Sequence, residues 1–432
     1  MADGAVFGNI TDRLKNVYTK VVTRQFAKDQ ILFALCNRDS KFIKGGGTAA
    51  YWYLHTDRNP SAGSYPNGGN YPHFGQQSGV QANAALKNIF TGVQFEEKTL
   101  YAAANDQQAF VDVEKYEIQR AMEDMKNEVA RQMWMDTTGV LGTVASTATD
   151  GSNTKVTLSA TAVPRYTPLT RFTRNNGYYT FLASDFSAIS SGANVQISTV
   201  NDTAGTFEFV TSGGPTLSAG NLVIKEQANT GHSATAGNDL NGVKSIFGTG
   251  NIYNVNTTNY SSFVSYIRTQ NEDPTEQVFS IMKQNIVRSG SKPDVIVTEP
   301  MVVAKYTNLL LTYKRVYIEA GTHEILGGVQ TTEDIDVLEG PEYIDVGPVI
   351  ADNNCFLGVN ANTAYCAMYE SDHLFIQEAG DIHWRDKDGN MLARVTGNPS
   401  QPFYQGNLDW FAEVCTDKRN ALALHTNMNQ QI

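Results

Sequence analysis

The sequence predicts an α+β fold that carries an inserted all-β domain. Three observations lead to this prediction: apolar residues at helical spacing in the first third of the chain, short alternating strands in residues 145–236, and helices mixed with strands after them. The chain has 432 residues, which exceeds the size at which a single hydrophobic core keeps growing, so several domains are expected.

The composition argues against several classes of protein. Hydrophobic residues make up 41% of the chain, enough for a real core, but no apolar run approaches the ~18 residues of a membrane span. The formal net charge of -11 comes without a cluster of Lys and Arg, so a groove for specific nucleic-acid binding is not expected. The N-terminus lacks the pattern of a secretory signal. We therefore expect neither membrane insertion nor secretion.

The four cysteines, Cys36, Cys355, Cys366 and Cys415, form no CxxC pair and lie mostly among apolar residues. This pattern is typical of free, buried thiols in a protein made in a reducing cytoplasm. The seven histidines are scattered, without ligand spacing beside a cysteine or carboxylate cluster. Neither a metal site nor a cofactor is therefore predicted.

The first hundred residues are predicted to form a helical arm followed by an extended loop. Apolar residues follow helical spacing from Ile10 to about Cys36. Residues 43–87 then combine Gly and Pro turn signals with aromatic side chains, whose burial such a loop cannot supply alone. We expect this loop to pack on a neighbouring subunit. The candidate contact residues are Tyr51, Trp52, Tyr53, Tyr65, Tyr71 and Phe74.

A strand beginning at Gly92 and a long helix are expected next. From about Asn105 an apolar stripe runs for some thirty residues, with charged residues mostly off it, and Gly139 ends the helix. Residues 145–236 are instead rich in Ser, Thr, Gly and Asn, and predict a sandwich or barrel. Its expected strands are Lys155–Ser159, Tyr178–Leu182, Asn194–Ser198, Thr206–Val210 and Leu222–Ile224.

The remaining chain predicts a compact α/β domain and then mostly strands. A helix is expected over Tyr260–Thr269, and a second one after an Asp273 cap, with Pro274 in the first helical position. A buried strand, Asp294–Thr298, and a helix from Pro300 to Leu311 follow. Later strands are expected at Val316–Ile318, Ile335–Val337, Tyr343–Val346, Thr363–Tyr369, Leu374–Ile376, Ile382–Arg385 and Met391–Val395.

The catalytic motifs that the sequence partly matches are incomplete. His323-Glu324 lacks the second histidine of a zinc protease, and Gly231–Thr235 lacks the final glycine of a nucleophile elbow. Asp386–Asn390 has its glycine at the wrong position for a calcium loop, and the lysine of Lys44–Thr48 precedes the glycines that would cradle a phosphate. A loop, a hairpin turn and a hinge are the simpler interpretations, and the chain is not expected to be an enzyme.

Several segments carry a resemblance to a known family. They are Val93–Tyr101 leading into Asp112–Ile118, Met133–Gly139 at the helix end, Lys292–Pro300 and Ile325–Val329. Together with the order of elements, they resemble the major capsid proteins of tailed double-stranded-DNA bacteriophages, which have the Hong Kong 97-type fold.

The resemblance implies a division into six parts. Residues 1–42 would be the N-terminal arm, and residues 43–100 the extended E-loop, with flanking strands, that lies on the adjacent subunit. The spine helix, 101–144, and returning strands, 376–432, would form the peripheral domain, and 237–375 the axial domain. Residues 145–236 would be an inserted domain that decorates the outer surface or braces capsomers.

The same resemblance implies self-assembly into hexamers and pentamers of an icosahedral phage head. The chain would be located in the virion after assembly in the bacterial cytoplasm, with scaffold, portal and possibly cement proteins as partners. Packaged DNA would be near it without sequence-specific binding. Lys44 is a conceivable crosslink donor, but no acceptor is apparent and no crosslink is favoured. No scaffolding segment is evident, which implies a separate scaffold protein or a mature sequence.

Two other functions are compatible with the sequence. The β-rich segment would also suit another virion component, such as a tail tube or decoration protein. Exposed Tyr and Trp on β loops would suit a carbohydrate-binding or hydrolytic protein, although no carboxylate pair can be nominated for catalysis.

Overall fold

The computed structural model describes residues 31–39, 48–96, 113–159, 175–201, 204–314, 339–343, 347–355, 362–384, 393–394 and 403–431. The predictions for the arm before Ile31, for Lys44, for His323-Glu324, for the strands Val316–Ile318 and Ile335–Val337, and for Asp386–Asn390 lie outside these residues.

The chain divides into two compact units. The larger unit contains Asp29–Ile89, Met125–His383 and Asp409–Ile432, and the smaller contains Met1–Lys28, Phe90–Asp124 and Trp384–Leu408. All four cysteines lie in the larger unit, buried and free, as predicted. No helix among the described residues is both long enough and apolar enough to cross a membrane.

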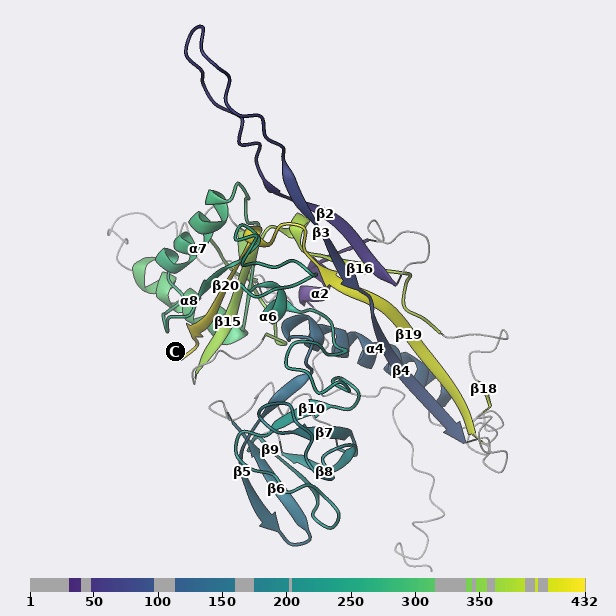
Figure 1. Cartoon of the computed structure of the whole chain (residues 1–432). Helices are drawn as coiled ribbons and strands as arrows, with labels where there is room; N and C mark the ends of the chain where they lie inside the picture. The colour runs from purple at the N-terminus through teal and green to yellow at the C-terminus, as the bar shows by residue number, and fades with distance from the viewer. Residues whose placement is uncertain are drawn as a thin grey trace, which may run out of the picture. The chain divides into compact units, whose positions relative to one another are not determined.

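The larger unit contains a mixed six-stranded sheet (Figure 1). Helices α7 (Glu276–Arg288) and α8 (Pro300–Lys314) pack on it, and Phe279, Met282 and Tyr306 join the sheet residues Ile296 and Met368 in one core. The strand order is β11 (Tyr266–Arg268), β20 (Leu422–Asn429), β15 (Thr363–Tyr369), β12 (Val295–Thr298), β14 (Gly347–Ala351) and β13 (Glu339–Tyr343).

Two local predictions for this region are wrong. Residues Tyr260–Thr269 form no helix, because β11 pairs in parallel with β20 and this tertiary pairing overrides a helix-like spacing. Helix α7 is capped by Thr275, whose side chain accepts a hydrogen bond from the Val278 amide. Asp273 instead binds the Lys305 ammonium at 2.6 Å, and the strand and helix predicted after α7 are confirmed as β12 and α8.

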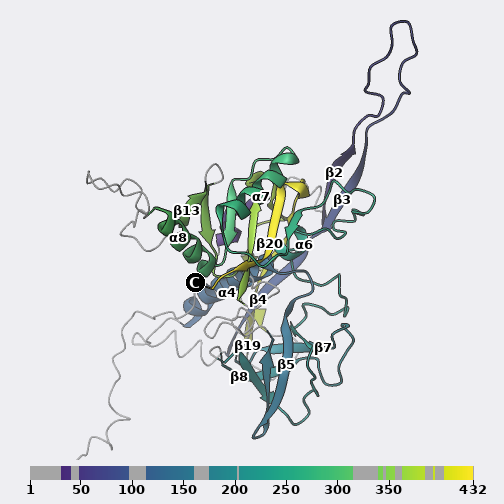
Figure 2. The ribbon, with the colours of Figure 1, turned by 90° about the vertical axis from the view of Figure 1, so that its left-hand side faces the viewer.

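The predicted β-rich segment contains a closed barrel (Figure 2). Its strand order is β10 (Leu222–Lys225), β5 (Val140–Asp150), β6 (Asn153–Leu158), β9 (Thr206–Val210), β8 (Val195–Asn201) and β7 (Tyr178–Leu182), and β7 pairs with β10 to close it. Buried side chains fill the interior, among them Leu158, Phe181, Phe207, Phe209 and Val223. The five predicted strands are confirmed, and the sequence pattern missed β5.

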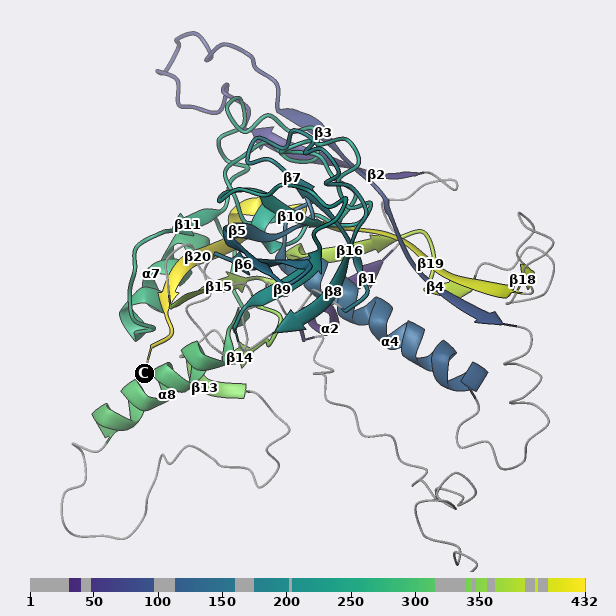
Figure 3. The ribbon, with the colours of Figure 1, turned by 90° about the horizontal axis from the view of Figure 1, so that it is seen from below.

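Helix α4 (Val113–Trp134) confirms the helix predicted before the barrel (Figure 3). Its last turns bury Met125, Val129 and Met133, as the apolar stripe predicts. The helix ends at Trp134, five residues before the Gly139 predicted to end it. Gly139 lies after the next turn at φ +69°, and a Cβ there would meet the Ala228 Cβ at 2.4 Å. Only glycine suits this close approach.

Buried ion pairs connect α4 to the barrel. The Arg131 guanidinium is fully buried and lies 2.6 Å from an Asp239 carboxylate oxygen and 2.5 Å from one of Glu128. Glu128 also accepts from Lys225 of β10 at 2.6 Å. Although burial opposes charge, the adjacent Arg131 and Lys225 lower the pKa of Glu128, so this carboxylate stays ionised. Burial instead raises the pKa of Asp239, although Arg131 opposes the rise.

The last strands divide between sheets. Strand β16 (Phe375–Glu378) pairs in parallel with β1 (Asn37–Asp39) and antiparallel with the end of β19 (Phe403–Cys415). Also paired with β19 are β4 (Lys87–Glu96), β17 (His383–Trp384) and β18 (Ala393–Arg394). The final strand, β20, lies instead in the mixed sheet beside β15, so residues 422–429 complete the sheet of the 237–375 segment.

The barrel interior generates a stability prediction. Replacing Phe209, which is fully buried, by alanine should lower the free energy of unfolding by about 3–5 kcal/mol, because a cavity replaces the ring. The neighbouring Val210 points outward, so Val210→Ala should cost less than about 1 kcal/mol. Urea denaturation of both variants makes the comparison, and equal losses would contradict the assignment of the two faces.

Candidate assembly surface

The predicted loop is a β-hairpin with two different faces. Strands β2 (Ala49–Asp57) and β3 (Ser78–Ala85) pair antiparallel, with Trp52 opposite Ala82 and Tyr53 opposite Gln81. Because side chains alternate along a strand, one face of the pair collects Ala50, Trp52 and Leu54, and the other collects Tyr51 and Tyr53.

The inner face of the hairpin is buried within the same chain. Trp52 is only 6% exposed, and its ring lies edge-on to Tyr253 with 5.1 Å between ring centroids. The alanines around it, Ala50, Ala82 and Ala84, leave room for the large indole. Trp52 therefore packs mainly within its own chain and anchors the hairpin, and its predicted role as an inter-subunit contact stays a prediction.

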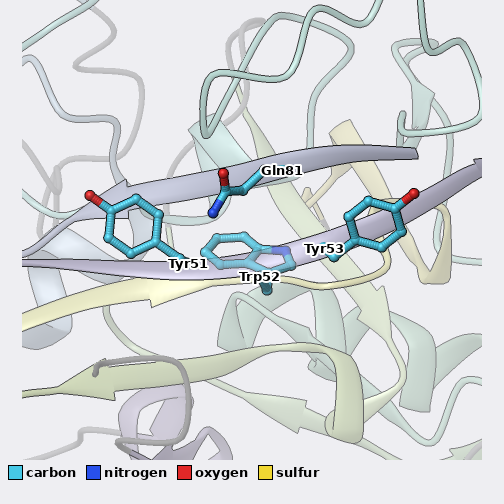
Figure 4. A pocket seen from close by; sticks show the side chains of 4 residues that line it. All are labelled: Tyr51, Trp52, Tyr53 and Gln81. Atoms are coloured by element: carbon cyan, nitrogen blue, oxygen red, sulfur yellow. The ribbon is translucent and has the colours of Figure 1, made fainter. Parts of the chain in front are cut away.

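The outer face of the hairpin is aromatic and exposed. Tyr51 is 49% exposed and Tyr53 is 66% exposed. With Trp52 and Gln81 they line a shallow, open depression of about 600 Å³ (Figure 4). The Tyr53 ring lies against Gly79, where a Cβ would come within 2.5 Å of the ring, so the glycine permits this placement.

The tip of the hairpin, residues 58–77, carries the other three candidate residues. The rings of Tyr65 and Tyr71 lie 4.8 Å apart across the turn Pro66–Gly69, in which the Gly69 amide donates to the Pro66 carbonyl. Phe74 is 93% exposed, and Tyr65 and Tyr71 are more than half exposed. The rings hold the tip closed but leave most of their surface in water.

The hairpin has no formal charge over a long stretch. No Asp, Glu, Lys or Arg occurs between Arg58 and Lys87. The centres of protein interfaces are enriched in aromatic residues and depleted of charged ones, and an aromatic surface of this kind marks an interaction site. The structure thus brings Tyr51 and Tyr53 together at the root, and Tyr65, Tyr71 and Phe74 near the tip. Their role as contacts remains a prediction.

Residues that the sequence pattern did not single out also matter. Tyr253, which supports Trp52, lies in a loop far along the chain and carries no motif, so no local signal could have identified it. Phe90 of β4 is 66% exposed, and the alternation of that strand was the available signal.

The larger unit also contains a buried carboxylate. Glu413 of β19 is 1% exposed and accepts from the Asn241 backbone amide at 2.8 Å, from the Asn241 side chain at 3.1 Å and from the Val414 amide at 3.0 Å. Burial raises the pKa of Glu413 to about 7, although these donors and the Lys87 ammonium oppose the rise.

The rejected motif that lies within the described residues is a loop, as predicted. Ser233 of Gly231–Thr235 accepts hydrogen bonds from the amides of Thr235 and Ala236, and no strand-to-helix turn surrounds it. Over the parts of the chain that the structure describes, no three His, Cys, Asp or Glu side chains gather closely enough to hold a metal ion.

No protein-family model and no curated protein matches the chain. Solved structures do match it. A chain of the capsid asymmetric unit of cyanophage A-1(L) has a TM-score of 0.57 at 12% identity, covering 99% of this chain and 100% of the other. The capsid of a native GTA particle gives 0.49 at 8% identity, with 99% and 100% covered. An encapsulin complex from Synechococcus elongatus gives 0.46 at 9% identity, with 99% and 98% covered.

The similarity to the cyanophage chain extends over the whole of both chains, and it identifies the fold. This chain has the fold of a phage capsid protein, as the sequence resemblance predicts.

Glu413 generates a pH prediction. Because the folded state binds this proton more tightly than the unfolded chain, the contribution of Glu413 to stability falls as pH rises from 4.5 to about 7. Over that window the loss should be about 3 kcal/mol at most. Glu413→Gln keeps an oxygen for the two backbone amides and removes the titrating group. The Asn241 side-chain amide, which donates to the other carboxylate oxygen, must turn over to accept from the new NH2 group.

The measurement is urea denaturation at pH 5 and pH 8. Glu413→Gln should be more stable than the wild type at pH 8 and should lose this part of the pH dependence. Glu226→Gln, at an exposed position, is the matched control and should leave the wild-type pH dependence in place. An unchanged pH dependence in Glu413→Gln would contradict the assignment.

Proposed function

We propose that this chain is the major capsid protein of a tailed double-stranded-DNA phage, and that it assembles with copies of itself into the hexamers and pentamers of an icosahedral head. The observation that carries the proposal is the aromatic hairpin, which has no formal charge between Arg58 and Lys87, on a chain with the fold of a capsid protein. A subunit that exposes such a surface gains free energy by burying it against another copy.

The hairpin contact is heterologous, because the aromatic hairpin of one copy meets a different surface on the next copy. Heterologous contacts generate closed rings when the rotation between neighbours closes, and pentamers and hexamers are rings of this kind. In this proposal residues 43–100 are the extended loop. Residues 101–144 and 376–432, apart from β20, form the peripheral domain, and 237–375 together with β20 forms the axial domain.

The remaining assignments follow from the same proposal. The barrel-containing segment 145–236 is an insertion that decorates the shell or braces capsomers. A scaffold, a portal and possibly cement proteins are partners, and the mature protein is part of the virion after assembly in the host cytoplasm. The net charge of -11 suits a wall beside packaged DNA that does not bind it specifically.

The tip of the hairpin provides the test of the proposed assembly. The wild-type chain, produced with the scaffold protein of its phage, should form closed shells in negative-stain electron microscopy. A Tyr65→Ser/Tyr71→Ser/Phe74→Ser variant should remain as unassembled subunits, because the apolar surface of the tip is lost. Its free energy of unfolding should change by less than about 0.5 kcal/mol, since these side chains are exposed.

A matched variant separates the loss of apolar surface from any disturbance of the tip. Tyr65→Phe/Tyr71→Phe/Phe74→Tyr keeps all three rings and should form shells. Normal shells from the serine variant would remove the tip from the assembly surface, and a wild-type chain that never assembles would refute the proposed function.

A further inference from the structure

An unusual turn supports the hairpin. In Ile252–Val255 the Val255 amide donates to the Ile252 carbonyl at 2.9 Å, and the two central residues, Tyr253 and Asn254, have φ of +53° and +60°. Positive φ at both central positions is the pattern of a type I′ turn, where Asn-Gly is preferred. A bulky tyrosine at the first position is unfavourable, and such conformations persist where the surroundings enforce them.

The surroundings of Tyr253 enforce its position through three contacts. Its ring packs edge-on against Trp52 of β2, and its backbone carbonyl accepts from the Asn83 amide of β3 at 3.0 Å. Its hydroxyl donates to the Val414 carbonyl of β19 at 2.8 Å. One residue therefore joins both strands of the hairpin to the interior of the larger unit.

The next residue of the turn adds a contact to the same hairpin strand. The side-chain amide of Asn254 donates to the side-chain oxygen of Asn83. The hairpin is thus held from β2 through an aromatic contact, and from β3 through a backbone and a side-chain hydrogen bond. Contacts on both strands restrict rotation of the hairpin about its own axis as well as bending.

The segment that precedes the turn, residues 245–250, is held in place by a buried guanidinium group. The Arg419 guanidinium, 1% exposed, donates to the carbonyls of Ser245, Ile246 and Gly250, just before the turn. Beside the other end of Tyr253, Glu413 holds the Val414 amide and Asn241. Side chains that are locked by neighbours in this way hold a functional group in a defined geometry.

We infer that the turn Ile252–Val255 positions the hairpin for contact with a second copy of this chain, with Tyr253 as the positioning residue. The inference rests on the proposed function. The hairpin acts as a lever: at ~3.3 Å per residue, the tip at Pro66 lies up to roughly 45 Å from Trp52. A rotation of about 10° at the root would move the tip by roughly 8 Å. Such a displacement is enough to miss the partner surface.

The test measures the position of the hairpin in the isolated full-length chain. Because all four native cysteines are buried, spin labels can be attached to Ser64→Cys at the tip and Glu276→Cys on α7, both exposed. Pulsed electron spin resonance should give a narrow distance distribution for this doubly labelled chain. Tyr253→Leu, which removes the ring contact and the hydroxyl, should broaden the distribution by about twofold or more.

Two further variants make the result specific. Trp52→Leu breaks the same contact from the hairpin side and leaves the turn intact, so it should broaden the distribution even if Tyr253→Leu fails to fold. Tyr253→Phe keeps the ring contact with Trp52 and should stay narrow. A broad distribution in the chain with its native Tyr253, or a narrow one in Trp52→Leu, would overturn the inference.

Assembly provides the second measurement. Trp52→Leu, produced with the scaffold protein, should give open or irregular particles in place of closed shells. Closed, regular shells from a variant with a broad distribution would overturn the positioning role while leaving the capsid function intact. Absence of shells from the wild type would refute the capsid function, whereas the distance measurement would still report on the turn.

Discussion

The hairpin β2–β3 has two faces with aromatic side chains, and the described residues of its own chain bury only one of them. Trp52 and its surrounding alanines account for the inner face, and Tyr253 completes that contact. Among the residues that the structure describes, nothing comparable covers the outer face and the tip, and the absence of formal charge between Arg58 and Lys87 leaves them without strong hydration. The free energy left unrealised in the single subunit is the driving force for assembly in the proposed function.

Two buried guanidinium groups hold together segments of the larger unit that are distant in the sequence. Arg131 binds carboxylates from α4 and from the loop that follows the barrel, whereas Arg419 is satisfied by carbonyl oxygens near the turn. Both guanidinium groups are buried and hydrogen-bonded, which makes their geometry exacting. Regions distant in sequence are thereby held in one arrangement, and the inner face of the hairpin has a fixed surface on which to pack.

The sequence predicted elements whose signals are local. The strands of the barrel alternate clearly, and α7, β12 and α8 have distinct periods and boundaries, so these predictions are confirmed. The failures involve long-range pairing. Residues Tyr260–Thr269 have helix-like spacing but include β11, because β20, more than a hundred and fifty positions later, offers it an edge.

The candidate assembly surface was also predicted only in part from the sequence. Aromatic residues among glycines and prolines identified the hairpin, since no loop buries so many rings alone. The separation of Trp52 from Tyr51 and Tyr53 depends on strand alternation together with the partner ring of Tyr253. That ring is two hundred residues away, and its unusual backbone conformation has no sequence signature: Tyr-Asn is a poor type I′ sequence.

The closure of the barrel has a consequence for the proposed assembly, in which many copies of the chain lie side by side. An open sheet ends in strands with unpaired amides and carbonyls, which can pair with the same strand of another molecule and aggregate. In the barrel β7 pairs with β10, so each of its six strands has a neighbour on both sides. A segment built this way can lie beside many copies of itself without polymerising through its backbone, and any contact it makes must use side chains.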